Sequence, residues 1–184
     1  MTSNILNADT SVLLIVDIQE KLLAAQPMAE KIMKKISTLA KAATVLDIPT
    51  ILTEQYPKGL GNTIEELKSL VSPSSRIIQK IEFSCIQAEG CLETLKSYSK
   101  NQIIICGVET HVCVHQTVNE LLKNGFEVHL VEDAVGSRNK FEHKKGIKRM
   151  IFDGAIPTCT EIVLFELLKD SKHHKFKEIQ SLIK

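Results

Sequence analysis

The chain has 184 residues, of which 43% are hydrophobic and 24% are charged, a balance typical of a folded globular protein. This length is enough for one sizeable core, so we expect a single domain over residues 1–184. The 23 basic and 22 acidic residues leave a formal net charge of +1. Such a balance does not favour nucleic acid or an anionic membrane as a partner.

The five cysteines do not follow the pattern of a disulfide framework or a zinc ribbon. Their number is odd, and no C-x-x-C occurs. The N-terminal stretch MTSNILNADT lacks the cationic start and apolar core of a secretory signal, and it lacks the arginines of a mitochondrial transit peptide. The longest apolar runs fall far short of the ~20 residues that a membrane span requires. The sequence therefore predicts a cytoplasmic protein with free thiols and no membrane partner.

Short β-branched runs alternate with longer helical patterns along the chain. The expected strands are residues 11–17, 49–54, 76–80, 101–108 and 126–133. The expected helices are residues 28–46, 88–98, 110–123, 140–151 and 159–169, with an apolar link at 154–157 and a final amphipathic helix in the tail 171–184. This alternation predicts a parallel sheet covered on both faces, and hence a doubly wound α/β fold.

Ligands of doubly wound folds bind at the carboxyl ends of the strands. Asp17 ends the first expected strand and Lys80 ends the third, so we expect both at the same edge of the sheet. The alternatives are a turn or helix-capping aspartate and a solvated surface lysine. The stretch after Asp17, DIQEKL, contains no glycine, which argues against a dinucleotide-binding loop. We therefore expect no cofactor.

The stretch IIICGVETHVCVHQTV (103–118) places Cys113 between His111 and His115 at the start of a helix. On a helix the two histidines share one face, while Cys113 lies about 200° around the axis from each. The three side chains therefore do not converge on one ion, and we expect no metal. A site made of the two histidines and residues from elsewhere is the alternative, which the absence of an H-E-x-x-H arrangement disfavours. A buried structural thiol is the alternative, which Cys106 inside the preceding strand fits well.

Cys113 differs from such a buried thiol by its location. Backbone N–H groups and the dipole at a helix start stabilise a thiolate and can hold an oxyanion. A nucleophilic cysteine also needs a base for its proton and a cation to bias its charge. Asp17 and Lys80 are the suitable groups expected at the same edge. A Ser-His-Asp hydrolase is not favoured, because G-x-S-x-G is absent.

Three separated motifs, LLIVDIQ, QKIEFS and CGVETHVCV, together resemble the isochorismatase-like cysteine hydrolase superfamily, in the same order over roughly residues 11–160. The resemblance implies a three-layer sandwich around a six-stranded, mostly parallel sheet of order 3-2-1-4-5-6. It implies a catalytic triad, which maps to Asp17, Lys80 and Cys113. It also implies a non-proline cis peptide bond between Val108 and Glu109.

Two departures narrow the subgroup. Nicotinamidases of this superfamily carry a metal site with histidines after the second strand, where this chain has TEQYPKGLGNTIEEL and no histidine. Isochorismatases proper lack the nucleophilic cysteine, so Cys113 argues against isochorismate as the substrate. The segment TEQYPKGLG resembles the small isochorismatase domain-containing hydrolases, whose substrates are largely unassigned.

The preferred hypothesis is an amidase-type hydrolase that cleaves a small amide-type C–N bond through a Cys113 thioester. We expect the backbone from Val108 through Glu109 and Thr110 to form the turn that holds the oxyanion. The expected substrate-binding residues, each of which has an ordinary loop residue as its alternative, are Gln19, Gln55, Tyr56, Phe83 and Glu109.

Two other function classes stay open on the sequence. The first is a thiol redox or sensing protein that uses Cys113, with Cys106 or Cys85 approaching it in space. The second is a non-catalytic oligomeric scaffold associated with RNA, which a near-neutral chain without aromatic-basic motifs supports little. Because the superfamily frequently forms dimers or larger assemblies, we expect a homo-oligomer that takes a small-molecule substrate.

Overall fold

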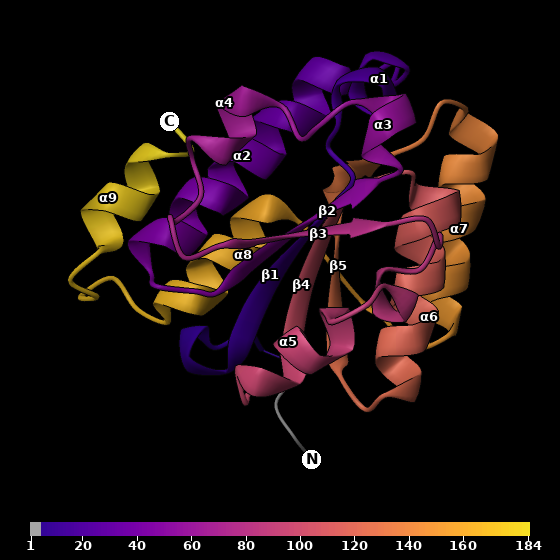
Figure 1. Cartoon of the computed structure of the whole chain (residues 1–184). Helices are drawn as coiled ribbons and strands as arrows, with labels where there is room; N and C mark the ends of the chain where they lie inside the picture. Colours follow the sequence, from indigo (N-terminus) through magenta and orange to yellow (C-terminus); the bar gives the residue numbers. More distant parts are fainter. Residues whose placement is uncertain (1–4) are drawn as a thin grey trace.

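The computed structural model describes residues 5–184 of the chain. Its six strands form one sheet in the order β3-β2-β1-β4-β5-β6, and every pairing is parallel (Figure 1). The predicted α/β class and sheet order are thus confirmed. The strands are β1 Ser11–Val16, β2 Thr50–Gln55, β3 Arg76–Lys80, β4 Gln102–Val108, β5 Glu127–Gly136 and β6 Ile156–Thr158.

Nine α-helices are described in residues 5–184, together with two 3-10 turns and one π turn. The α-helices are α1 Glu20–Ala24, α2 Ala29–Val45, α3 Pro57–Leu60, α4 Glu65–Lys68, α5 Cys91–Ser97, α6 His115–Lys123, α7 Lys140–Phe152, α8 Thr160–Leu168 and α9 Phe176–Ser181. The 3-10 turns are η1 Ala8–Thr10 and η2 Cys85–Gln87, and the π turn is η3 Thr110–Val114.

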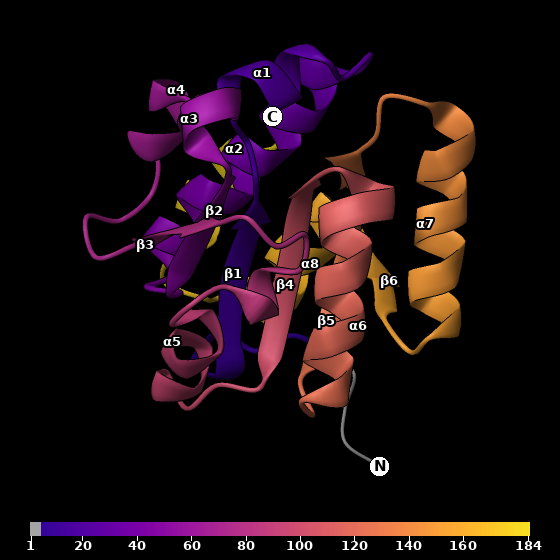
Figure 2. The same ribbon diagram turned by 45° about the vertical axis from the view of Figure 1, so that its right-hand side comes forward.

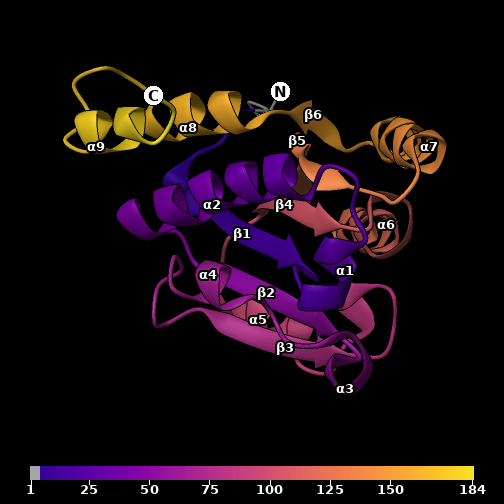
Figure 3. The same cartoon turned by 90° about the horizontal axis from the view of Figure 1, so that it is seen from above.

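The central strands are buried on both faces, which explains why their sequences are continuous apolar runs. Along β1, Val12, Leu14 and Val16 join the core that α5 and α6 cover. The alternate residues Leu13 and Ile15 join the core that α2 and α8 cover. Figure 3 shows α2 and α6 on opposite sides of the sheet, and Figure 2 shows α6 and α7 side by side.

One predicted connection is a strand in the structure. The stretch 154–157, expected to be a link, leads into β6, which pairs with His129–Val131 of β5. A strand of three residues is too short to show a periodic pattern, which explains the error. Its Pro157 is tolerated because β6 is the edge strand.

The bounds of several other elements differ from the predicted bounds by a few residues. The fifth strand continues three residues beyond the predicted end, to Gly136, and the tail helix is confined to Phe176–Ser181. The helix expected at 110–123 begins as the π turn η3 before α6. None of the helices described for residues 5–184 combines the length and apolar character that crossing a membrane requires.

The carboxyl edge of the sheet is shaped by unusual backbone conformations. Asp17, directly after β1, has a φ of 52°, and Tyr56, directly after β2, has a φ of 39°. Gly107 in β4 has a φ of 119°, and a Cβ there would lie 2.1 Å from the carbonyl oxygen of Val16. Only glycine therefore allows β4 to approach the end of β1 this closely.

Candidate active site

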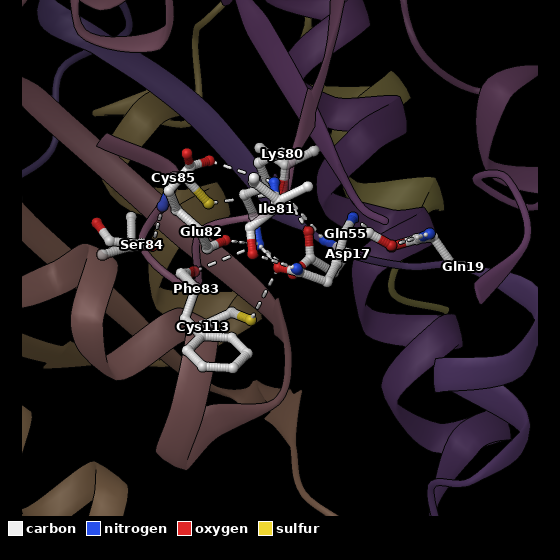
Figure 4. Close-up of polar contacts among 12 residues, drawn as sticks. Asp17, Gln19, Gln55, Lys80, Ile81, Glu82, Phe83, Ser84, Cys85 and Cys113 are labelled. Atoms are coloured by element: carbon white, nitrogen blue, oxygen red, sulfur yellow. Dashed lines mark hydrogen bonds and ion pairs between the residues drawn. The ribbon is translucent and has the colours of Figure 1, made fainter. Parts of the chain in front are cut away.

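A buried ion pair between Lys80 and Asp17 lies at the centre of the candidate site (Figure 4). Lys80 Nζ is 2.7 Å from Asp17 Oδ2, and neither side chain is exposed. Burial by itself lowers the pKa of Lys80, but the Asp17 carboxylate, with help from Cys85 and Cys113, outweighs burial and raises that pKa. Lys80 is therefore a cation at neutral pH.

Thr53 holds the other oxygen of Asp17. Its hydroxyl donates to Asp17 Oδ1 at 2.6 Å and accepts from the Asp17 backbone N–H at 3.3 Å. The same hydroxyl oxygen accepts from the thiol of Cys85 at 3.6 Å. One hydroxyl can make all three contacts because it has one donor and two acceptor positions. The Asp17 carboxylate is thus oriented through both of its oxygens.

Cys113 lies in the π turn η3, which follows β4, and its side chain is 6% exposed. Its Sγ is 3.9 Å from Gln55 Oε1. Burial raises the pKa of the Cys113 thiol, the Asp17 carboxylate raises it further, and Lys80 offsets only part of this rise. The resting thiol is therefore protonated at neutral pH. Desolvation and a neighbouring anion thus outweigh the stabilisation that the dipole of one turn gives to a thiolate.

Gln55 connects the ion pair to the turn that carries Cys113. Its Oε1 accepts from Lys80 Nζ at 2.7 Å and from the Cys113 thiol at 3.9 Å. Its Nε2 donates to the carbonyl of Ile81 at 2.8 Å. The side chain of Gln19 pairs with both backbone groups of Gln55, at 2.7 and 3.0 Å. Gln19 thus fixes the backbone whose side chain lies between Lys80 and Cys113.

The turn that precedes Cys113 begins with a cis peptide bond between Val108 and Glu109. Two side-chain contacts anchor this turn. Burial raises the pKa of Glu109, but the bonds from the Nε and backbone N–H of Arg138, at 2.8 and 3.2 Å, outweigh burial and lower that pKa. The buried Thr110 shares a 2.9 Å hydrogen bond with His143 Nδ1 of α7. The turn is therefore held by the loop after β5 and by α7.

A carboxylate, a cation and a thiol thus lie together at the carboxyl edge of a 3-2-1-4-5-6 sheet. Known protein families were compared with this chain. The sequence model of the isochorismatase domain matches residues 11–162. The chain belongs to this family. The resemblance found in the three motifs is thereby confirmed.

Three similar proteins illustrate this family. Isochorismatase domain-containing protein 1 of Salmo salar is 39% identical over 177 residues, which are 95% of this chain but only 61% of the relative. The structure described as the MAR1 ribonuclease of Caenorhabditis elegans is 40% identical, with a TM-score of 0.92 and coverage of 97% of this chain and 91% of that chain. The YcaC protein of Escherichia coli, described as an octameric hydrolase of unknown specificity, is 26% identical, with a TM-score of 0.87 and coverage of 100% and 96%.

Tyr56 and Phe83, which we predicted to line the pocket of this isochorismatase-family protein, lie on the loops after β2 and β3. Each side chain is 54% exposed. Phe83 contacts the ion pair through its backbone, because its carbonyl accepts from Lys80 Nζ at 3.3 Å. Gln55 and Glu109, by contrast, are nearly buried, and Gln19 is fully buried. The five predicted substrate-binding residues therefore divide into two exposed rings and three buried polar groups.

The two histidines that flank Cys113 in sequence have their own partners. His111 Nδ1 is 3.0 Å from the Ser137 hydroxyl, and His115 Nε2 is 3.2 Å from Asn119 Nδ2. In residues 5–184 no group of three or more His, Cys, Asp or Glu side chains is arranged to hold a metal ion.

Sequence reasoning missed Thr53 and Arg138 as members of the site, and it named Cys85 only as a possible redox partner of Cys113. A hydroxyl in the otherwise apolar start of a buried strand, TILTEQ, was the available signal for Thr53. Cys85 and Arg138 lie in loops or short turns, where no periodic pattern indicates direction. Their roles depend on tertiary contacts alone.

Proposed function

We propose that this protein is a cysteine hydrolase that cleaves a small amide-type C–N bond through a thioester at Cys113. One observation carries the proposal. Lys80 Nζ is 2.7 Å from Asp17 Oδ2 and 2.7 Å from Gln55 Oε1, and that Gln55 oxygen is 3.9 Å from Cys113 Sγ. A base, a cation and a thiol thus meet in one buried site, as nucleophilic catalysis by cysteine requires.

The first step moves the thiol proton to Asp17 as Cys113 Sγ attacks the amide carbonyl carbon. The net charge of the three groups together with the substrate does not change, because the negative charge passes from the carboxylate to the sulfur and then to the substrate oxygen. Lys80, a cation throughout, stabilises each of these anions in turn. We propose that backbone N–H groups of the turn from Val108 to Thr110 and of Cys113 hold the oxyanion.

The second step breaks the C–N bond. Asp17 returns its proton to the leaving nitrogen, the amine departs, and the acyl group stays on Cys113 as a thioester. Water then gives a proton to Asp17 and attacks the thioester carbonyl. The C–S bond breaks, Asp17 passes its proton to the Cys113 sulfur, and the carboxylic acid departs from the regenerated site. The balance is one amide and one water in, and one amine and one acid out.

We propose a small substrate because the reacting groups are deeply buried. The exposed fraction is 0% for Asp17, 4% for Lys80 and 6% for Cys113. The exposed rings of Tyr56 and Phe83 are suited to cover the apolar part of such a substrate. We propose Gln19, Gln55 and Glu109 as the polar wall, with Gln19 acting through the backbone of Gln55.

The proposal is tested by incubating the protein with a panel of small amides and searching for an acyl adduct on Cys113 by intact and peptide mass spectrometry. Cys113→Ala should lose both the adduct and turnover, by at least a factor of about 10³ in kcat/KM. Cys159→Ala, a thiol in the linker before α8, is the matched control and should retain both. Full turnover by Cys113→Ala of any substrate found would refute the mechanism.

Action on RNA is a second candidate, because the Caenorhabditis elegans relative is described as a ribonuclease. The test is degradation of a labelled single-stranded RNA by wild type and by Cys113→Ala. RNA loss that is equal in both variants and absent after further purification would indicate a contaminant. RNA loss that depends on Cys113 would replace the amide as the substrate.

We also propose a homo-oligomer in the cytoplasm. The octameric state described for YcaC of Escherichia coli supports the assembly, and five free cysteines support a reducing compartment. Light scattering should give a mass of two or more times 20.5 kDa, whereas a 20.5 kDa particle would exclude the assembly. Cell fractionation with a tagged chain tests the location.

A further inference from the structure

An open groove of about 980 Å³ lies between α2 and α7, and its lining residue His143 bonds Thr110 in the turn before Cys113. It exists because β6 pairs only with His129–Val131, so the rest of β5 has no neighbouring strand on that side. The segment of β5 from Glu132 to Gly136 therefore contributes to the floor between the two helices. Neither Asp17, Lys80 nor Cys113 lines it.

The surface of the groove is largely apolar. Ile32 of α2, Val135 of β5 and Ile147 of α7 form its buried or half-buried part. Met28 and Ile151 stand at the rim, with exposed fractions of 54% and 37%. A concave apolar surface of this kind on a water-facing side of a protein marks an interaction site.

Both rims of the groove carry lysines. Lys31, Lys34 and Lys35 line it from α2, and the lysines at 140, 144 and 148 line it from α7, against only two acidic residues, Glu132 and Asp133. Lys35 is paired with Asp133 at 3.1 Å, and the other five lysines form no ion pair within residues 5–184.

The lysines on α7 recur every four residues, so they form a row along one side of that helix at intervals of about 6 Å. The row spans about 12 Å from Lys140 to Lys148. On the opposite rim Lys31 and Lys35 have the same spacing. The groove thus presents an apolar strip between two rows of positive charge.

We propose that this groove binds an amphipathic helix of a partner protein, in which an apolar stripe is flanked by Asp and Glu residues. Apolar residues at i, i+3, i+4 and i+7 of such a helix would cover the floor. Carboxylates at every fourth position on both flanks would match the spacing of the two lysine rows. The proposal does not depend on the hydrolase activity.

Other anionic ligands match the groove less well. A lipid or fatty-acid head group would engage one or two lysines and leave the remaining positive charges unmatched. A flat bilayer does not enter a concave surface. Single-stranded RNA is held mainly by phosphate contacts and by stacking on aromatic rings. Among residues 5–184 no Phe, Tyr or Trp lines this groove, and its one imidazole, His143, is hydrogen-bonded to Thr110.

The test uses a synthetic fluorescent peptide of about 18 residues, with Leu at i, i+3, i+4 and i+7 and Glu on both flanks. Anisotropy titration with the full-length wild-type protein should give saturable binding. Binding should weaken as salt rises, because exposed charges are screened. A peptide of the same composition shuffled to remove the stripe, and one with Lys in place of Glu, should bind at least about tenfold more weakly.

Variants locate the binding site on the protein. Lys144→Glu with Lys148→Glu should weaken peptide binding at least about tenfold, and Ile151→Glu alone should weaken it as well. The matched control reverses two exposed lysines on other helices, Lys96→Glu with Lys123→Glu, and should change binding less than about twofold. Circular dichroism verifies that each variant is folded.

Three results would overturn the proposal. The first is equal binding of the designed and shuffled peptides, or none at all. The second is preferential binding of a labelled oligouridylate or of phosphatidylcholine–phosphatidylserine vesicles that Lys144→Glu with Lys148→Glu abolishes. The third is a change of oligomeric state in that double variant without peptide binding to wild type, which would make a second copy of the chain the occupant.

Discussion

Lys80 Nζ has two acceptors at the same distance of 2.7 Å, the carboxylate of Asp17 and the amide oxygen of Gln55. A buried cation with one charged and one neutral acceptor can exchange its charged partner without leaving its position. In the proposed mechanism that exchange moves the anion from Asp17 to Cys113. The residues that hold Asp17 and Gln55 in place, Thr53 and Gln19, matter because the cation itself does not move.

Removal of the cation should destabilise the fold. Lys80→Met leaves the Asp17 carboxylate buried with no counter-charge, which costs about 3–5 kcal/mol of unfolding free energy at neutral pH. Urea denaturation followed by circular dichroism measures this loss. The double variant Asp17→Asn with Lys80→Met should recover most of it, because no charge is then buried. Equal stability of Lys80→Met and wild type would contradict the buried ion pair.

Neutralisation of Asp17 should make the Cys113 thiol more acidic. The Asp17 carboxylate raises the pKa of that thiol and Lys80 lowers it, so Asp17→Asn removes the opposing anion and leaves the cation. The midpoint of the pH profile for alkylation of Cys113 by iodoacetamide should therefore move to lower pH, while turnover is lost. Thr53→Val, which keeps the carboxylate, is the control and should move the midpoint less. An upward shift in Asp17→Asn would contradict this account.

Much of the site could be placed from the sequence because parallel strands end at one edge. Asp17 and Lys80 each end an expected strand, and this position predicted that they would lie at the same edge. The depth at which Cys113 is buried was not predicted, because burial depends on packing that no local pattern encodes. The role of Gln55 between Lys80 and Cys113 likewise depends on the register of β2 and β3, in which Gln55 and Lys80 are neighbours.

At the scale of elements, α7 determines where the turn η3, which carries Cys113, lies. A Cβ added to Gly146 would lie 3.0 Å from both the Cα of His111 and the carbonyl oxygen of Thr110. The helix and the turn therefore pack backbone to backbone at this point. The hydrogen bond from Thr110 to His143 fixes the same contact one turn earlier on α7.

Gly146→Ala should separate the two elements while improving the helix itself. Alanine is favoured over glycine inside a helix by about 1 kcal/mol, which offsets part of the cost of the tight contact. We therefore expect a small change in the melting temperature and a clear change in the alkylation rate of Cys113. Lys145→Ala, an exposed neighbour on α7, is the control and should alter neither. An unchanged rate in Gly146→Ala would show that the turn does not depend on α7.

Strands and helices of ordinary length could be predicted from the sequence, whereas short ones could not. The strands of five residues or more lie within a few residues of their predicted places. The three-residue β6, the π turn η3 and the short helices α1, α3 and α4 carry too few residues for a period to appear. The groove between α2 and α7 depends on β6 being short, so it was beyond sequence reasoning for the same reason.

At the scale of the whole molecule, a net charge of +1 conceals an uneven distribution. Six of the 23 basic residues line one groove. Two titratable groups outside this groove's lysine rows are partly buried. His115 and His143 both lie near the turn η3, and burial lowers the pKa of each below its ordinary value of 6.5.

These two histidines should make the unfolding free energy depend on pH in mildly acidic solution. Below pH 6.5 the unfolded chain binds protons that the folded chain resists, so stability falls as pH decreases from 6.5 toward the lower folded pKa values. Urea midpoints between neutral pH and pH 5 measure the slope. His115→Asn with His143→Asn should flatten it, whereas His174→Asn, at an exposed position in the tail, should leave it unchanged. Because His143 bonds Thr110 in the turn of Cys113, a slope that survives the double variant would place the acid-sensitive groups away from the active site.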